Sequence, residues 1–387
     1  MAPLRSGGGV DLSRELSGEP RGRGGPEPAR RGGCPPSLDW DALIRLAIEQ
    51  GVAPLVAVRT RQLRLSVPVR ERLESIYSSN SLRNLRLAAE ESRVSAALSA
   101  AGLRHWPLKG PTLSERLYGD IGVRQIADLD LLVEPAGFAR ADALLAGLGY
   151  VRQTRGAIDS LSAAQELIYV RDCSAPSSLA AAFYLDLHQR LLPYVRRDPL
   201  AARVFADGMT RENLLLYLCA NQITHRFARL RYLCDVAACL ERESASVNWE
   251  AFLDAARRMP WGPGIGLALG WAAEFVPAGV PSQVLRALRP NPLGDLLLRR
   301  SLGDGAAEAV SRMRMLDGPG GATVSLGAAY LGRPTAARIA WQMMFPSRAY
   351  LREQTGAPAG DPLLSTYAAR LMRKLPAALR HLLKAAP

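Results

Sequence analysis

The sequence predicts an α+β fold, in which N-terminal helices and a small mixed β-sheet core precede a mostly helical C-terminal domain. Short runs that alternate apolar and polar residues, typical of strands, occur between about 105 and 188. Stretches with helical spacing of apolar residues lie before and after them. With 387 residues, 48% of them hydrophobic, the chain can form two cores. We therefore expect a disordered tail at 1–37, the α+β core at 38–198 and a helical domain at 199–387.

The helices before the sheet have recognisable ends. Ser37 or Asp39 can cap a first helix, which we expect to end near Gly51. A longer helix is predicted from Pro68 to about Ala101, because apolar residues recur there at helical spacing between Arg and Glu.

The core then alternates strands and helices. Strands are predicted at 105–108, 126–133, 150–152, 166–170 and 183–188, and helices at 110–117 and 135–148. Beyond residue 199 the apolar spacing is helical, with predicted helical segments at 212–240, 249–258, 264–276 and 282–288, a weakly patterned stretch at 289–332, and amphipathic basic segments at 335–344 and 363–386.

Bulk composition narrows the function classes. The formal net charge of +13 suggests an anionic partner such as a nucleotide, a nucleic acid or a phosphate-bearing substrate, although any single arginine is more often a solvated surface residue. Five cysteines without a CxxC pair indicate neither a disulfide framework nor a zinc site. No apolar run reaches the roughly 20 residues of a membrane span, and the N-terminus lacks the apolar segment of a secretory signal. We therefore expect a cytoplasmic protein outside the membrane.

Two acids lie on the strand predicted at 126–133. Asp128 and Asp130 are two residues apart, so both side chains leave the same face of the strand. Leu129, Leu131 and Val133 alternate with them and are expected to pack into the core behind. Because two like charges side by side repel, a divalent cation between them is a natural explanation.

A third acid, Asp186, lies on a later predicted strand. Three carboxylates on adjacent strands can hold two Mg²⁺ ions for in-line displacement at phosphorus, and Mn²⁺ could take their place. Magnesium favours such sites because it binds carboxylates together with substrate phosphates. His188 lies two residues after Asp186, and is either a catalytic group or a hydrogen-bonded structural histidine.

A phosphate-binding segment is predicted just upstream. Gly110-Pro111 opens a helix whose N-terminal backbone N–H groups could bind phosphate, and Lys109 adds a point charge suited to the β- or γ-phosphate. Arg124 lies four residues before Asp128 and could bind phosphate or pair with the acids. Each feature alone is common in proteins; their order and spacing make the site prediction.

These motifs also occur in the spacing typical of one family. They are Asp39-Trp40-Asp41, Leu108-Lys109-Gly110, Tyr118, Arg124, the run from Asp128 to Val133, Gly149-Tyr150, Leu185-Asp186-Leu187-His188, the run from Leu230 to Val236, and Trp249-Glu250. Over roughly residues 38–290 the chain thus resembles the uncharacterised bacterial nucleotidyltransferase family of the DNA polymerase β-like superfamily.

The resemblance implies a nucleotidyltransferase core in which Asp128 and Asp130 are the metal-binding pair and Asp186 the third carboxylate. It implies Mg²⁺-dependent transfer of NMP from an NTP, such as ATP, to a hydroxyl acceptor, with release of pyrophosphate. The acceptor is unknown, and a small molecule or modified peptide is favoured over nucleic acid. The superfamily's usual Gly-Ser is here Lys109-Gly110, so Lys109 could replace the serine that contacts phosphate.

Two other functions stay open at this point. The missing serine and the basic excess are compatible with a nucleotide- or nucleic-acid-binding module that has lost catalysis. The long helical part is also compatible with a scaffold that docks a partner, for example one encoded in the same biosynthetic operon.

Overall fold

The computed structural model describes residues 38–153, 166–172, 182–192, 292, 363–365, 367–368 and 198–289, the last without 226, 228, 260 and 277–278. The tail predicted at 1–37 and the segment predicted at 335–344 lie outside these residues, as does most of the chain beyond 289.

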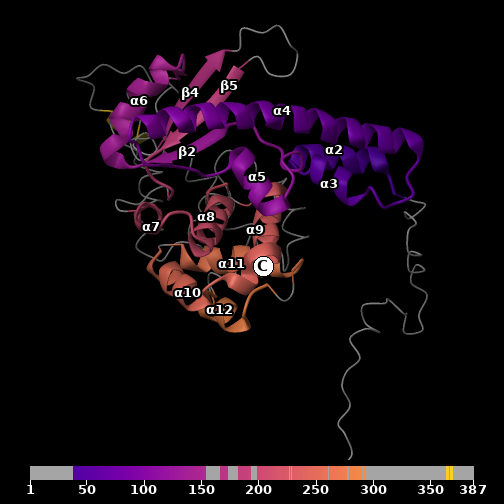
Figure 1. The fold of residues 1–387 in the computed structure, drawn as a ribbon. Coiled ribbons are helices and arrows are strands. Elements are labelled where there is room, and N and C mark those ends of the chain that lie inside the picture. The colour runs from indigo at the N-terminus through magenta and orange to yellow at the C-terminus, as the bar shows by residue number, and fades with distance from the viewer. Residues whose placement is uncertain are drawn as a thin grey trace, which may run out of the picture.

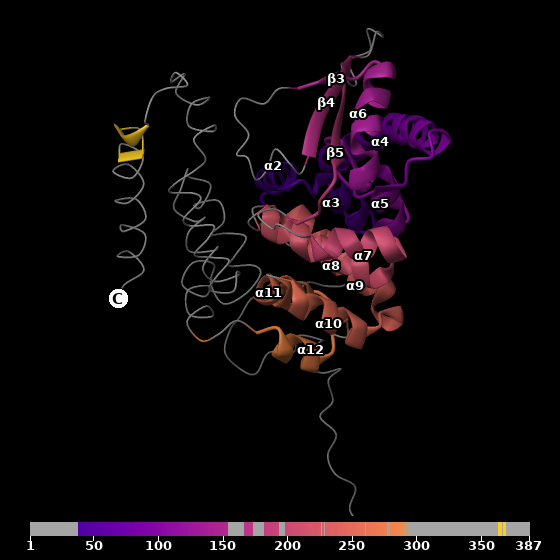
Figure 2. The same cartoon turned by 90° about the vertical axis from the view of Figure 1, so that its left-hand side faces the viewer.

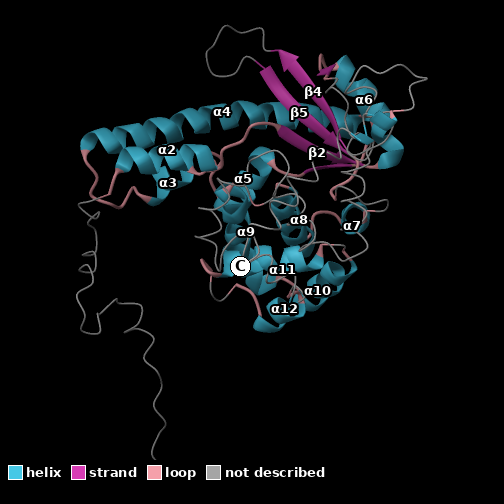
Figure 3. Cartoon of the chain, turned by 180° about the vertical axis from the view of Figure 1, so that it is seen from behind, coloured by secondary structure: helices cyan, strands magenta, loops and turns pink. Residues whose placement is uncertain are grey.

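Five strands form one mixed sheet in the order β1-β2-β5-β4-β3. They are β1 (His105–Pro107), β2 (Leu129–Val133), β3 (Val151–Arg152), β4 (Glu166–Asp172) and β5 (Ala182–His188). The central pair β2–β5 is parallel, whereas β1–β2, β3–β4 and β4–β5 are antiparallel. All five lie where the sequence predicts strands, and the predicted α+β class with a small mixed sheet is confirmed (Figure 3).

Helices surround this sheet (Figure 1). Before or between the strands lie α2 (Trp40–Gln50), α3 (Ala53–Arg59), α4 (Val67–Ala100), α5 (Gly110–Tyr118), the 3₁₀ turn η1 (Pro135–Gly137) and α6 (Phe138–Gly147). After the sheet come α7 (Pro199–Asp207), α8 (Arg211–Thr224), α9 (Leu230–Glu243), η2 (Ser244–Ser246), α10 (Trp249–Arg258), α11 (Gly262–Ala273) and α12 (Ser282–Ala287). None of the described helices is long and apolar enough to cross a membrane.

The predicted helix ends are confirmed in the N-terminal part. The side chain of Asp39 accepts a hydrogen bond from the backbone of Ala42 at 2.9 Å, and Gly51 ends α2 in the left-handed conformation. The long helix α4 holds the segment that leads into β2, because Asn80 and Asn84 both donate side-chain hydrogen bonds to the carbonyl of Arg124. The sheet and this segment are thus fixed to one rigid helix.

The two faces of the sheet have different neighbours. Leu129, Leu131 and Val133 pack with α4 and α6 in one buried cluster, as their alternation predicts. Leu132 faces the other way and belongs to a cluster that contains residues of α5 and of α8 to α12. Figure 2 shows α8 to α12 stacked in succession below the sheet, with α10 and α12 furthest from it. The second cluster contains residues from both sides of position 199, where we predict a domain boundary. The acids of β2 and β5 therefore face the helices that follow the sheet.

One break in the helical part is not marked by glycine or proline. The apolar stripe at 212–240 predicts continuous helix, whereas α8 ends at Thr224 and α9 begins at Leu230. Between them Phe227 has φ +57°, and its buried ring packs edge-on against Trp271 with the centroids 4.9 Å apart. Burial of this ring offsets the cost of the left-handed backbone conformation at Phe227. The chain changes direction at this residue.

Candidate active site

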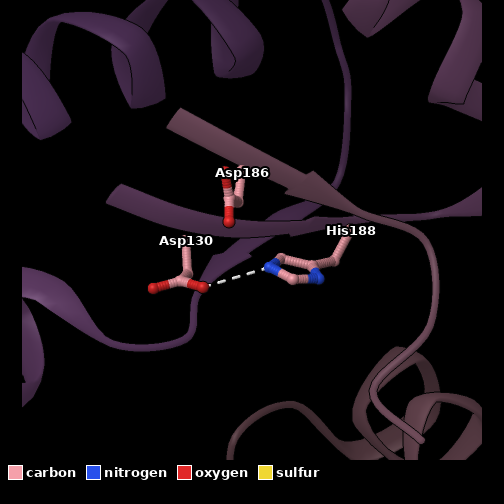
Figure 4. Close-up of side chains that lie close together, drawn as sticks. All are labelled: Asp130, Asp186 and His188. Atoms are coloured by element: carbon pink, nitrogen blue, oxygen red, sulfur yellow. Dashed lines mark hydrogen bonds and ion pairs between the residues drawn. The ribbon is translucent and has the colours of Figure 1, made fainter. Parts of the chain in front are cut away.

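Asp130 and Asp186 lie side by side at the centre of the sheet. They are register partners in the parallel pair β2–β5, and His188 lies two residues further along β5 on the same face. One ligand atom from each of these three residues lies within 4.8 Å of the others. Figure 4 shows the imidazole of His188 directed at Asp130, with Asp186 beside them. The two carboxylates and the imidazole therefore converge on one place.

The two carboxylate oxygens of Asp130 have different surroundings. Oδ1 accepts a hydrogen bond from Lys109 Nζ at 3.0 Å, and His188 Nε2 lies 3.1 Å from it. Oδ2 is buried and has no hydrogen-bond partner among the described residues. Burial opposes ionisation, but Lys109 and His188 hold the pKa of Asp130 well below its usual range. An ionised oxygen buried without a donor is costly, so these residues fit a cation bound at Oδ2.

Asp128 lies one residue before β2, and among the described residues the group of close ligand atoms contains His188 and not Asp128. Burial, and then the neighbouring charge of Asp130, raise the pKa of Asp128, while Lys109 and Arg231 act in the opposite direction. A divalent cation would offset the repulsion between the two acids. Asp130 and Asp186 thus offer oxygen donors of the type that Mg²⁺ and Mn²⁺ prefer.

Glu91 is a further buried carboxylate, and the sequence analysis does not predict a role for it. It lies on α4 and accepts hydrogen bonds from the hydroxyl and the backbone of Thr112, in the first turn of α5. Its Oε2 lies close over Gly110, which has φ +71° and where a Cβ would come within 2.7 Å of that oxygen. Glu91 therefore caps the N-terminus of α5. The sequence predicts that the backbone N–H groups at this end could bind phosphate, but the N–H of Thr112 already donates to Glu91.

Arg124 is held by a partner from the helical part. Its Nε donates to both carboxylate oxygens of Asp235 on α9 at 3.1 Å, and Tyr118 donates to Asp235 Oδ1 at 2.9 Å. The structure thus pairs Arg124 with Asp235 rather than with Asp128. A lone acid in the apolar stripe of a predicted helix is a signal of such a buried partner, and the sequence around Asp235 carries it.

Comparison with known proteins adds one finding to this geometry. A family model described as "Uncharacterised nucleotidyltransferase" matches residues 36–277 of the 387. Neither the curated proteins nor the solved structures contain a match. The matched range includes both strands that carry the acids, and also α9 with Asp235.

Proposed function

Because the chain belongs to the uncharacterised nucleotidyltransferase family, we propose that it transfers NMP from an NTP to a hydroxyl acceptor in a reaction that needs a divalent cation. The observation that carries the metal requirement is the placement of Asp130 opposite Asp186, with Asp130 Oδ2 buried and without a donor among the described residues. The family match supports nucleotidyl transfer in general; the metal, the nucleotide and the acceptor are our proposal.

In this proposal Asp128, Asp130 and Asp186 hold two Mg²⁺ ions, and Mn²⁺ can substitute. A bound ion neutralises charge on the phosphates and lowers the pKa of the attacking hydroxyl. Lys109 and Gly110 bind the β- and γ-phosphates. His188 holds Asp130 Oδ1, so that Oδ2 stays directed at the cation. The pair with Asp235 gives Arg124 the role of an anchor for α9, in place of its predicted phosphate contact.

The reaction then follows from these positions. The acceptor oxygen attacks the α-phosphorus, the bond to the bridging oxygen of the β-phosphate breaks, and pyrophosphate leaves with that electron pair. The hydroxyl proton passes to Asp186 or to water. We propose a small molecule or a modified peptide as acceptor, because either needs only a pocket, whereas a polymeric acceptor needs a long basic groove.

Labelled nucleotides test this proposal. The purified protein is incubated with each α-³²P-labelled NTP, with Mg²⁺, Mn²⁺ or chelator, in the presence of a cell extract that supplies acceptors. We expect metal-dependent transfer of label, lost in Asp128→Ala/Asp130→Ala and retained in Asp172→Ala, a change of an exposed acid on β4. Equal transfer by the double variant and the wild type would show the assignment to be wrong.

A second candidate is a binding module without catalysis. It is favoured by the contact between Lys109 and Asp130, since the ammonium supplies a cation to that carboxylate without a metal. The same labelling experiment separates the two. Nucleotide or nucleic-acid binding that is insensitive to chelator and yields no labelled product would support the module.

A further inference from the structure

An ion pair ties α9 to the segment that leads to the acids of the proposed site. Arg231 and Asp235 are four residues apart on α9 and therefore lie on the same side, one turn apart. Asp235 is fixed to Arg124, and Asp128 follows Arg124 by four residues in the segment that leads into β2. The anchored pair therefore places Arg231 one helical turn before the residue that binds Arg124.

The guanidinium of Arg231 is held in place but is only partly used. Its Nη2 donates to the hydroxyl of Tyr232 at 2.8 Å, and its Cζ lies 4.8 Å from the centroid of that ring. His225 stacks on the same ring, with the centroids 4.4 Å apart. Gly51 makes room for the side chain, because a Cβ there would lie 2.9 Å from Arg231 Cδ. The Nε of Arg231 is buried and has no acceptor among the described residues.

A buried guanidinium N–H without an acceptor costs free energy, just as the bare oxygen of Asp130 does. These are two of eight buried side-chain atoms without a partner among the described residues, and they have opposite character: one is an N–H donor on α9, and the other is an acceptor on β2. A metal–triphosphate would satisfy both, since the cation binds the carboxylates and the phosphate oxygens accept from arginine. Arginine suits this role because its planar fork matches phosphate geometry.

We infer that Arg231 binds the triphosphate of the nucleotide. Its guanidinium is the positive charge that α9 contributes to the proposed site. This inference rests on the proposed function and assigns to Arg231 the contact that the sequence predicts for Arg124. The main competing role is structural, in which Arg231 only balances the charge of Asp128 and packs against Tyr232.

Binding of ATP and AMP to the full chain distinguishes these roles. If the wild type binds GTP, CTP or UTP more tightly than ATP, that triphosphate and its monophosphate are used instead. Dissociation constants are measured with Mn²⁺ for the wild type, Arg231→Gln and Arg231→Lys. The control is Arg257→Gln, a change of an exposed arginine at the end of α10. Thermal melting of each variant without ligand reports on folding.

Arg231→Gln should weaken triphosphate binding about ten- to a hundredfold, the size of a lost charge-assisted hydrogen bond. The monophosphate should change less than about threefold, and Arg231→Lys should be intermediate, because a point charge replaces a fork. Equal weakening of both nucleotides, or no change in either, would overturn the inference. A wild type that binds Mn²⁺–triphosphate but never transfers label would overturn the proposed function alone, while one that binds no triphosphate overturns both.

Discussion

Two buried ion pairs lie close together in this protein and differ in how they are completed. Arg124 and Asp235 satisfy each other, since Arg124 Nε donates to both oxygens and Tyr118 adds a further donor. Lys109 and Asp130 do not satisfy each other fully. Lys109 and His188 both contact Asp130 Oδ1, and Oδ2 has no hydrogen-bond donor among the described residues. A pair that only holds elements together can use every lone pair. A pair that must also bind a cation has to keep an oxygen without a donor.

The largest expected effect is on the incomplete pair. Asp130→Asn keeps the shape but removes the charge that would face the metal. Transfer should fall by about 10³-fold or more, because several kcal/mol of charge stabilisation are lost. Labelled-nucleotide kinetics at saturating Mg²⁺ measures this loss.

The stability of the same variant sharpens the contrast. Asp130→Asn loses the attraction between Asp130 and Lys109, but it also removes the repulsion between Asp130 and Asp128. Because these effects oppose each other, the free energy of unfolding should change less than in Asp235→Ala. If Asp130→Asn kept full activity and instead unfolded at much lower denaturant, the roles of the two pairs would be reversed.

The complete pair should matter mainly for folding. Asp235→Ala leaves the guanidinium of Arg124, of which only 6% is exposed, buried without its partner. Such a loss costs about 3–5 kcal/mol, to be measured by urea unfolding. The control is Asp254→Ala, which breaks the exposed pair with Arg258 and should cost under about 1 kcal/mol. Similar costs for both variants would contradict the structural role.

His188 should have a smaller effect, because it contacts Asp130 Oδ1, whereas Oδ2 would bind the proposed metal. His188→Gln should weaken Mn²⁺ binding about ten- to a hundredfold, as is typical when a group that orients a ligand is lost. His105→Gln is the matched control, since His105 lies on β1 of the same sheet and its Nδ1 is 3.0 Å from the carbonyl oxygen of Leu103. Titration calorimetry without nucleotide gives both affinities. Equal affinities in wild type and His188→Gln would assign His188 to structure alone.

Much of the site could be predicted because strand alternation is local. The apolar residues at 129, 131 and 133 determine which way Asp130 points, and the same alternation in β5 determines the direction of Asp186. The register that places these two acids opposite each other joins distant segments, and local pattern carries no information on it. The family resemblance implies that Asp186 is the third carboxylate but does not give this register, and the family match confirms the family.

The contacts that sequence reasoning missed are all long-range. No glycine or proline marks the turn at Phe227, yet α9 begins shortly after it, and Asp235 on α9 pairs with Arg124. The positive φ of Gly110 and its lack of a Cβ also admit the carboxylate of Glu91, a contact that the sequence does not predict. Such roles depend on a partner from another helix, which spacing along the chain does not reveal.

The smallest expected effect distinguishes two neighbouring residues of α4. Burial raises the pKa of Glu91, against the hydrogen bonds from Thr112, so Glu91 stabilises the fold most when protonated. Burial also opposes ionisation of Glu90, but Arg93, Tyr150 and Arg171 lower its pKa to about 2, so Glu90 stabilises the fold when ionised.

Unfolding as a function of pH tests this opposite behaviour. The contribution of Glu91 is present below the usual glutamate pKa and is lost as the pH rises through its raised value. Glu91→Gln keeps an acceptor for Thr112, so relative to wild type it should gain stability from pH 4 to pH 8, by about 1 kcal/mol or less. The contribution of Glu90 is present above the usual glutamate pKa and is lost as the pH falls towards 2. Glu90→Gln should therefore be destabilised at pH 8 and approach wild type at acid pH. A pH-independent difference for Glu91→Gln would mean that its carboxyl group has the same pKa in the folded and unfolded chain, and that it caps α5 without responding to the acids beside it.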